Sequence, residues 1–255
     1  VKHIIGNVFV GYRQAVYAEC GKQGYCLVIC SVVCRGTVIF GISTYRGTYL
    51  LPPVLKKFHA LYPRVHVEIC EMDSIDLENK ILEGLLDLAL IAAPPVRIKH
   101  GVDFLMRDEI MIATTADHPV MAFAKPCESE PEQMWIDLKD TAPFEYILGP
   151  PITGLRSLRE AGVEPLGLDT YLSASFAAAM AREGVGLAFT YRSCRIMRDE
   201  FRYLRIGKDG IFLDLALAWP AGKYRSRAAM ALAKLFQEMA PELLRREQSF
   251  CSNSR

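Results

Sequence analysis

The first clear pattern of apolar and polar positions lies between residues 36 and 93. Residues 37–42 form a nearly continuous apolar run, which is typical of a strand covered on both faces. Apolar residues then recur at helical spacing, which predicts a helix with Thr48 as its N-cap. Pro52 and Pro53 would lie in the first turn of that helix, where a missing N–H group costs little.

The same segment continues with further alternation. The pattern predicts a strand over residues 65–69, a helix capped by Asp73 or Ser74, and a third strand over residues 86–92. Strand, helix, strand, helix and strand in this order make a half-sheet with a binding crevice along its carboxyl edge.

A second set of elements follows. We expect extended structure over residues 104–115 and an irregular, charged surface segment over residues 120–139. Alternating strands and helices in two similar sets favour two α/β lobes. The remaining predicted elements are strands over 144–148, 166–172, 186–191, 201–206 and 212–219, a short helix ending at Gly162, a helix capped by Ser173 or Ser175, and an amphipathic helix over 227–244.

Composition narrows the function classes. The 255 residues are 51% apolar, which is ample for a packed core, and 30 basic against 29 acidic residues give a net charge of +1. A nucleic-acid footprint should appear as a basic excess, and none appears over the chain as a whole. No run of 18 apolar residues predicts a membrane span. We therefore expect a cytoplasmic protein with no membrane partner.

Residues 1–35 stand apart from this pattern because four glycines interrupt any long helix. Four of the eight cysteines, Cys20, Cys26, Cys30 and Cys34, lie in this segment. No second Cys/His pair follows at a spacing suited to zinc, so we predict reduced cysteines and no metal site.

Enzyme signatures are missing from the sequence. The five histidines form no His-x-His or HExxH pair, and no nucleophile elbow, P-loop or complete dinucleotide fingerprint occurs. Cys194 could act as a nucleophile, but the sequence nominates no base to activate it. We predict no enzyme activity and no cofactor.

Several short motifs, in a fixed order, resemble the effector-binding domain of LysR-type transcriptional regulators. They are Leu50-Leu51-Pro52, Tyr62-Pro63, the stretch 84–89, Asp117-His118-Pro119 and the stretch 183–188. The similarity runs from about residue 36 to residue 240, roughly four-fifths of the chain.

The resemblance implies an α/β fold with two Rossmann-like lobes and a ligand cleft between them, similar to a type 2 periplasmic-binding protein. It implies a first lobe of residues 36–118 and 216–245 and a second lobe of residues 119–215, after an atypical N-terminal segment. The function implied is sensing of a small-molecule effector that changes a dimer and so controls transcription.

The resemblance also places ligand-binding residues at the lobe edges. Helix N-termini at Thr48, Ser74, Thr153 and Ser175 would offer unpaired N–H groups to an anion, although these side chains could equally be plain helix caps. The candidate ligand-binding residues are Thr44, Tyr45, Arg46, Ser74, Ile152, Thr153, Ser175 and Thr190.

Two of these candidates have open alternatives. Arg46, beside Gly47, could hold a carboxylate through both guanidinium nitrogens, or it could be a solvated turn residue. Tyr45 could narrow the pocket, or it could pack against Tyr49.

Residues 1–35 do not have the pattern of a winged helix-turn-helix and a linker helix. We therefore expect this chain to reach DNA only through such a module, which these 255 residues lack, and to form a homodimer or tetramer that binds a small anionic effector. The alternative from another class is an exported solute-binding protein of a transporter, which shares the two-lobe architecture.

Overall fold

The computed structural model describes residues 36–128, 130–148, 153–169 and 174–245, and it begins with the predicted half-sheet. Strand β1 pairs in parallel with β2 and with β3, and two helices connect them. This part of the sequence prediction is confirmed. The elements are β1 (Gly36–Ile42), α3 (Thr44–Leu61), β2 (Val65–Glu71), α4 (Ser74–Leu82) and β3 (Leu88–Ala93).

The start of α3 differs from the prediction. The helix begins at Thr44, a full turn earlier than Thr48, and Ser43 is its N-cap residue. Thr48 lies inside the helix, where its hydroxyl donates to the carbonyl of Thr44 at 2.9 Å. Pro52 and Pro53 therefore lie in the helix interior. Buried aromatic side chains in the first two turns supply the packing that extends the helix beyond what local propensity indicates.

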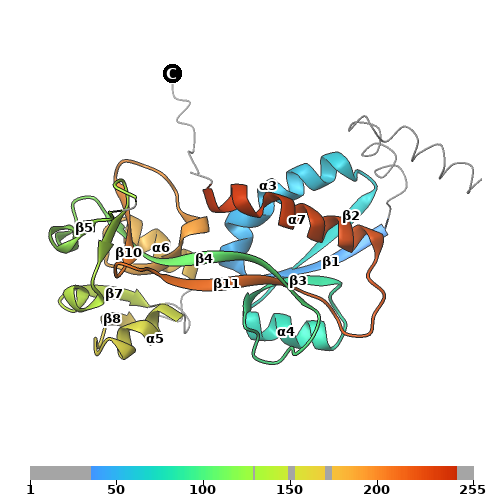
Figure 1. Ribbon diagram of the computed structural model, residues 1–255, viewed down its shortest axis with the longest axis horizontal. Helices are drawn as coiled ribbons and strands as arrows, with labels where there is room; N and C mark the ends of the chain where they lie inside the picture. Colours follow the sequence, from blue (N-terminus) through green and yellow to red (C-terminus); the bar gives the residue numbers. More distant parts are fainter. Residues whose placement is uncertain (1–35, 129, 149–152, 170–173, 246–255) are drawn as a thin grey trace, which may run out of the picture.

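Two long antiparallel strands connect the two ends of the molecule. Strands β4 (Val102–Thr115) and β11 (Ile211–Ala218) pair along their length, with a bulge between Leu215 and Ala216. Figure 1 shows both strands running from the α3, α4 and α7 end to the α5 and α6 end. We call these ends the first and second lobes. Because both strands pass through the boundary, the residues at which the lobes divide remain a prediction.

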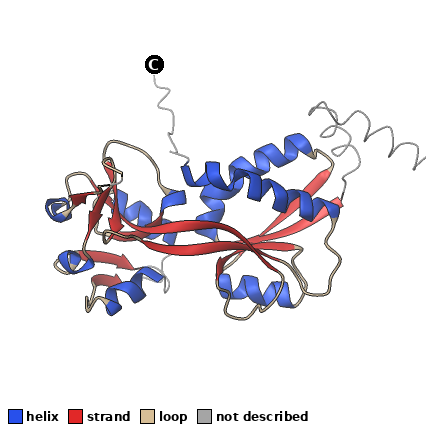
Figure 2. Cartoon of the chain, in the orientation of Figure 1, coloured by secondary structure: helices blue, strands red, loops and turns tan. Residues whose placement is uncertain are grey.

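The second lobe surrounds the far ends of these strands. The main sheet has the order β2-β1-β3-β11-β4-β10-β6-β5, β9 also pairs with β4, and β7 and β8 pair in parallel. Figure 2 shows the strands in red and the helices around them in blue. Residues 120–139 contain two 3₁₀ helices and two short strands, so the irregular segment predicted there is wrong. The remaining elements are η1 (Pro119–Phe123), β5 (Lys125–Pro126), β6 (Met134–Ile136), η2 (Leu138–Thr141), β7 (Glu145–Leu148), α5 (Thr153–Glu160), β8 (Leu166–Asp169), α6 (Ala174–Arg182), β9 (Ala188–Tyr191), η3 (Arg192–Cys194), β10 (Phe201–Ile206) and α7 (Arg227–Arg245).

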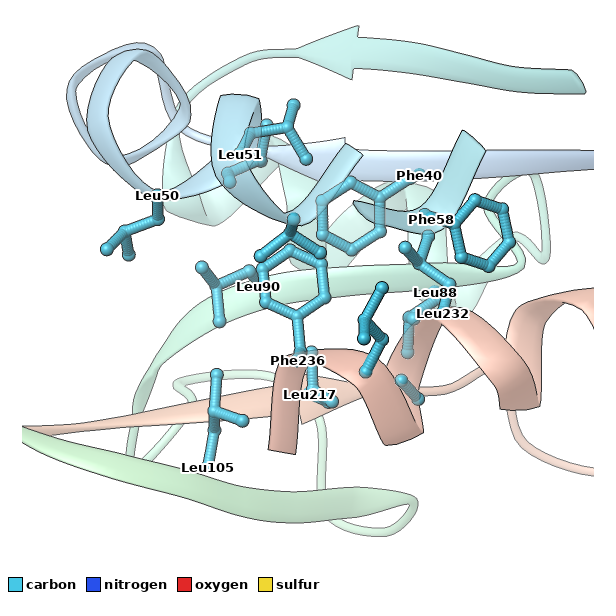
Figure 3. Packing of buried hydrophobic residues seen from close by; sticks show 14 of the residues in the cluster. Phe40, Leu50, Leu51, Phe58, Leu88, Leu90, Leu105, Leu217, Leu232 and Phe236 are labelled. Carbon is cyan, nitrogen blue, oxygen red and sulfur yellow. The ribbon is translucent and has the colours of Figure 1, made fainter. Parts of the chain in front are cut away.

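The first lobe has helices on both faces of its sheet. On one face α3 and α7 pack together over β1, where the rings of Phe40 and Phe236 stack with centroids 5.2 Å apart (Figure 3). On the other face Leu77 of α4 packs against β1 at Gly41, where an added Cβ would lie 2.6 Å from a methyl carbon of Leu77. A side chain at this position would push α4 away from the sheet.

Helix α3 also contributes to the second lobe. Its middle residues, such as Phe58, belong to the first-lobe core, whereas Tyr45 and Tyr49 pack with second-lobe residues, among them Leu187 and Phe189. The first turns of α3 thus lie at the contact between the lobes, where the sequence predicts a ligand site. No helix in the described part of the chain is long and apolar enough to cross a membrane.

Candidate functional site

Two predicted site residues from different lobes meet directly. The hydroxyl of Tyr45, in the first turn of α3, makes a hydrogen bond with the hydroxyl of Thr190, near the end of β9. The Tyr45 ring also packs edge-on against Tyr49 and tilted against Tyr191, with centroids 5.4 and 5.8 Å away. The predicted packing of Tyr45 against Tyr49 is therefore confirmed, whereas its part in narrowing a ligand pocket remains a prediction.

Burial keeps the Tyr45 hydroxyl neutral. Its side chain is only 5% exposed, and loss of solvation is the main cause that raises its pKa well above the ordinary value. The hydroxyl can consequently act as a donor or an acceptor at physiological pH, and it stays uncharged.

Arg46 is buried, so the expectation of a solvated turn residue is wrong. Arg46 is 5% exposed, and its guanidinium carbon lies 4.5 Å from the centre of the Tyr191 ring. The Nε atom is buried without a hydrogen-bond partner in the described part of the chain. A buried donor on a cation is costly unless it is paired, so this atom is where an acceptor would be stabilised most.

Asp108 is a buried acid on which the charge of Arg46 acts, and the sequence analysis did not select it. Burial raises the pKa of Asp108, and the hydrogen bonds from Ser193 and the charge of Arg46 oppose that rise. Its carboxylate accepts from the Ser193 hydroxyl at 2.6 Å, from the Ser193 amide at 3.2 Å and from the Glu109 amide at 3.0 Å. The sequence offers no clear signal for it, because Asp108 stands in the charged triplet Arg107-Asp108-Glu109.

A second polar contact joins the lobes beside Tyr45. Arg182, at the end of α6, donates to the Tyr49 hydroxyl with its two terminal nitrogens at 3.4 and 3.2 Å. Its Nε donates to the carbonyl of Ala178 at 2.9 Å. We call Tyr45, Arg46, Tyr49, Asp108, Arg182, Thr190, Tyr191 and Ser193 the interlobe cluster.

The other predicted site residues lie outside this cluster. Thr44 is exposed at the start of α3, and Ser74 is half-buried at the start of α4. The cap of α4 is Asp73, whose carboxylate accepts from the amides of Ile75 and Asp76, each at 2.9 Å. Ser74 is therefore free of the capping role, and its part in a site remains a prediction.

The structure says less about the candidate ligand-binding residues of the second lobe. Ser175 is half-buried in the first turn of α6, and Thr153 is the first residue of α5. Ile152 and Ser173, like the cysteines of residues 1–35, lie outside the described residues. Ligand contacts by Ser175, Thr153 and Ile152 remain predictions.

The described residues at this contact favour neither catalysis by Cys194 nor metal binding. Cys194 is buried beside Ser193, and burial is the main cause that raises the pKa of its thiol, which disfavours the reactive thiolate. Among the residues that the structure describes, no group of three or more His, Cys, Asp and Glu side chains is arranged to hold a metal ion.

Relatives with curated names are transcriptional regulators. A "Probable RuBisCO transcriptional regulator" of Cyanophora paradoxa is 24% identical over 267 residues, which cover 98% of this chain and 79% of that protein. A protein of the same name from Trieres chinensis is 28% identical over 117 residues, 45% of this chain and 38% of that protein. The uncharacterized regulator YcgK of Bacillus subtilis is 34% identical over 73 residues, 29% of this chain and 22% of that protein. This chain thus spans well under half of the length of the Trieres chinensis and Bacillus subtilis proteins.

Solved structures share the fold. The Synechocystis PCC6803 CcmR regulatory domain in complex with 2-PG has a TM-score of 0.68 at 16% identity, covering 81% of this chain and 98% of that one. The effector binding domain of QuiR in complex with shikimate has a TM-score of 0.63 at 17% identity, covering 82% and 99%. The predicted two-lobe, type 2 periplasmic-binding-protein-like fold is thereby confirmed.

The family model described as "LysR substrate binding domain" matches residues 34–241, which is most of the chain and includes every described element of both lobes up to α7. The chain belongs to the LysR substrate-binding domain family.

Proposed function

We propose that this domain senses a small anionic effector at the interlobe cluster and controls transcription through a DNA-binding module joined to it. The observation that carries the proposal is Arg46: a buried cation in the first turn of α3 whose Nε has no partner in the described part of the chain. A carboxylate or phosphate oxygen at this atom would supply the acceptor that Nε lacks.

The start of α3 adds a second attraction for an anion. Ser43 occupies the N-cap position, but its side chain makes no capping hydrogen bond. The first amides of this eighteen-residue helix, that of Arg46 among them, therefore have no side-chain cap and lie at the positive end of the helix dipole. Arg46 and these amides together favour a ligand with a localised negative charge.

The mechanism that we propose is a shift between two lobe arrangements. Tyr45 and Thr190 hold the lobes together in this structure, and Tyr49 and Arg182 add a second contact. An effector that binds Arg46 would part Tyr45 from Thr190 and stabilise a different arrangement, which a dimer then passes to its DNA-binding modules. The cost of opening these contacts lowers the apparent affinity for the effector.

Two other functions are less well supported. The family model and the named relatives are those of regulators, so a transporter's solute-binding protein is not favoured. We also propose that the domain has no catalytic role, because burial keeps Cys194, the one nucleophile that the sequence suggested, in its protonated form.

The proposal is tested by calorimetric titration of the full chain with small carboxylates and phosphates, including shikimate and 2-PG, which occur in two related structures. At least one anion should bind, and an Arg46→Gln protein should lose about tenfold or more in affinity for it. Arg64→Gln, an equal loss of charge at an exposed site on the first lobe, should leave the affinity unchanged. Equal affinities for both variants would overturn the assignment of Arg46.

A further inference from the structure

A cavity of about 320 Å³ lies in the second lobe, lined by residues other than those of the interlobe cluster. It forms where β10 extends beyond its neighbour: β6 pairs only with residues 204–206, so the edge of residues 201–203 is left open on that side. The chain that follows η3, residues 195–199, passes across this open edge. The volume falls at the lower end of the range for small-molecule sites.

The walls of the cavity are held in place by hydrogen bonds. The Gln133 amide donates to the carbonyls of Tyr203 and Met134 at 2.7 and 2.8 Å. The Tyr203 hydroxyl accepts from the Ile196 amide at 3.0 Å and donates to the Ile196 carbonyl at 3.1 Å. These bonds fix the strand, the segment before β6 and the crossing chain relative to one another, so a ligand would not need to order them.

The lining is cationic on an apolar base. Its charged members are three arginines, at 195, 198 and 202, and two carboxylates, Glu132 and Asp199, which leaves one positive charge in excess. Phe201 lies beneath the guanidinium of Arg198, whose carbon is 5.8 Å from the ring centre. Met134, Ile196 and Met197 add further apolar surface.

Arg198 is weakly held, whereas Arg202 is fixed at the cavity by its own hydrogen bonds. The ion pair of Arg198 with Glu200 is 3.7 Å long and joins side chains that are 52% and 59% exposed, so it holds Arg198 only weakly. Arg202 uses Nη1 to donate to the carbonyls of Asp199 and Phe201 at 2.6 and 2.8 Å. Both of these hydrogen bonds use Nη1, so the donors of the other terminal nitrogen are left for an anion.

We propose that this cavity is a second ligand site and that it takes a small carboxylate with an aromatic or other apolar body. None of the interlobe-cluster residues lines it, although Arg182 of that cluster lies 5.9 Å from the centre of the Phe201 ring. The carboxylate binds Arg198 and Arg202, and the apolar body lies on Phe201 and the methionines. Arginine is the side chain best suited to this combination, because it binds carboxylates through two nitrogens and stacks on flat rings.

Benzoate is the probe for the test, and methyl NMR of the methionines in the full chain is the readout. Met134 and Met197 line the cavity, whereas Met111 pairs with Thr190 across β4 and β9 and reports on the interlobe cluster. Benzoate should shift the Met134 and Met197 signals in a saturable way at concentrations of up to about 10 mM. Neutral benzamide, of nearly the same shape, should bind at least about tenfold more weakly.

Matched charge variants complete the test. Arg198→Gln/Arg202→Gln should weaken the benzoate-induced shifts of Met134 and Met197 by about tenfold or more. Arg156→Gln/Arg159→Gln removes the same charge from the exposed face of α5 and should leave them unchanged. Arg46→Gln should also leave them unchanged, so failure of this site and failure of the interlobe site are distinguishable.

Three results would overturn the proposal. The first is the absence of saturable shifts at Met134 and Met197 in a wild-type protein whose spectrum shows a folded chain. The second is equal binding of benzoate and benzamide. The third is equal weakening by the two double variants, which would mean that benzoate responds only to net charge.

Discussion

The hydroxyl of Tyr45 bonds to the hydroxyl of Thr190, 145 positions later in the chain, and so joins the first turn of α3 to β9. Both residues are buried, at 5% and 1% exposure. A buried hydroxyl that loses its partner carries the full cost of desolvation. Removing one hydroxyl oxygen from this contact should therefore weaken the packing of the two lobes against each other.

Replacing Tyr45 by Phe keeps the ring and removes that atom. We expect the free energy of unfolding in urea to fall by about 1–3 kcal/mol, because the Thr190 hydroxyl is left without a partner. The double variant Tyr45→Phe/Thr190→Val removes both hydroxyls and should be more stable than the sum of the single variants indicates. Tyr224→Phe, at an 83% exposed position, should change little. Additive single-variant effects would show that the two hydroxyls do not interact.

Replacing Arg46 by Lys keeps the charge and removes the planar pair of donors. If an anionic effector binds both guanidinium nitrogens, its affinity should fall by about tenfold even though the charge remains. The measurement is calorimetric titration with the anion that the wild-type chain binds, and Arg64→Lys is the matched control. Full retention of affinity in Arg46→Lys would mean that the effector recognises charge alone.

The start of α4 separates capping from ligand binding. Asp73 is the cap, so Asp73→Ala should lower the free energy of unfolding by about 1 kcal/mol. Ser74→Ala should leave stability almost unchanged, since Ser74 is not the N-cap residue. If Ser74 contacts the effector, Ser74→Ala should weaken effector binding by about tenfold. Titration of Ser74→Ala with unchanged affinity would remove Ser74 from the site.

Acid should weaken one partly exposed ion-pair cluster in the second lobe. Hydrogen bonds from Arg192, at 2.6 Å, and from Arg205, at 3.0 Å, lower the pKa of Glu130 below its ordinary value of 4.5. A lowered folded-state pKa means stability that is present above pH 4.5 and is lost as the pH falls through the lowered pKa.

Glu130→Gln provides the measurement. The difference in urea midpoint between wild type and Glu130→Gln should be largest near neutral pH and should shrink as the pH falls below about 4. Glu128→Gln, whose side chain is 94% exposed, should show a small difference that does not depend on pH. A wild-type advantage that persists undiminished in acid would contradict the role given to the Glu130 carboxylate.

The proposed dimer can be tested at α6. Phe176, a large apolar side chain, is 52% exposed on this helix of the second lobe, and we expect a partner chain to cover it. We expect sedimentation to show a species larger than the 28.6 kDa chain, and Phe176→Glu to shift it toward the monomer. Tyr224→Glu, at an exposed site away from α6, should leave the distribution unchanged. A monomeric wild-type chain at micromolar concentration would reject the dimer.

The elements with strong periodicity were predictable, because their apolar residues face one core. The parallel half-sheet of β1, β2 and β3, the strand β10 and the helix α7 all lie close to their predicted positions. The start of α3 was missed because Thr48 looks like a cap, whereas the packing of Tyr45 against the second lobe decides where the helix begins.

The site was only partly predictable for the same reason. Tyr45, Arg46 and Thr190 were selected from the sequence, and the structure brings them together. The burial of Arg46 and the presence of Asp108 depend on strands and helices that meet from distant parts of the chain. Local sequence patterns do not show which distant elements pack together, so the charge of Arg46 and its neighbour Gly47 indicated a solvated turn.

The continuous pairing of β4 with β11 has a mechanical consequence. The two lobes are joined by a ribbon of paired strands, so any rearrangement has to twist that ribbon while its hydrogen bonds hold. The bulge between Leu215 and Ala216 already breaks the regular register and increases the local twist, so we expect the twist of the ribbon to change there. A signal from the effector should therefore leave the domain as a rotation about this point, small in angle at the ribbon and large in displacement at the outer faces of the lobes.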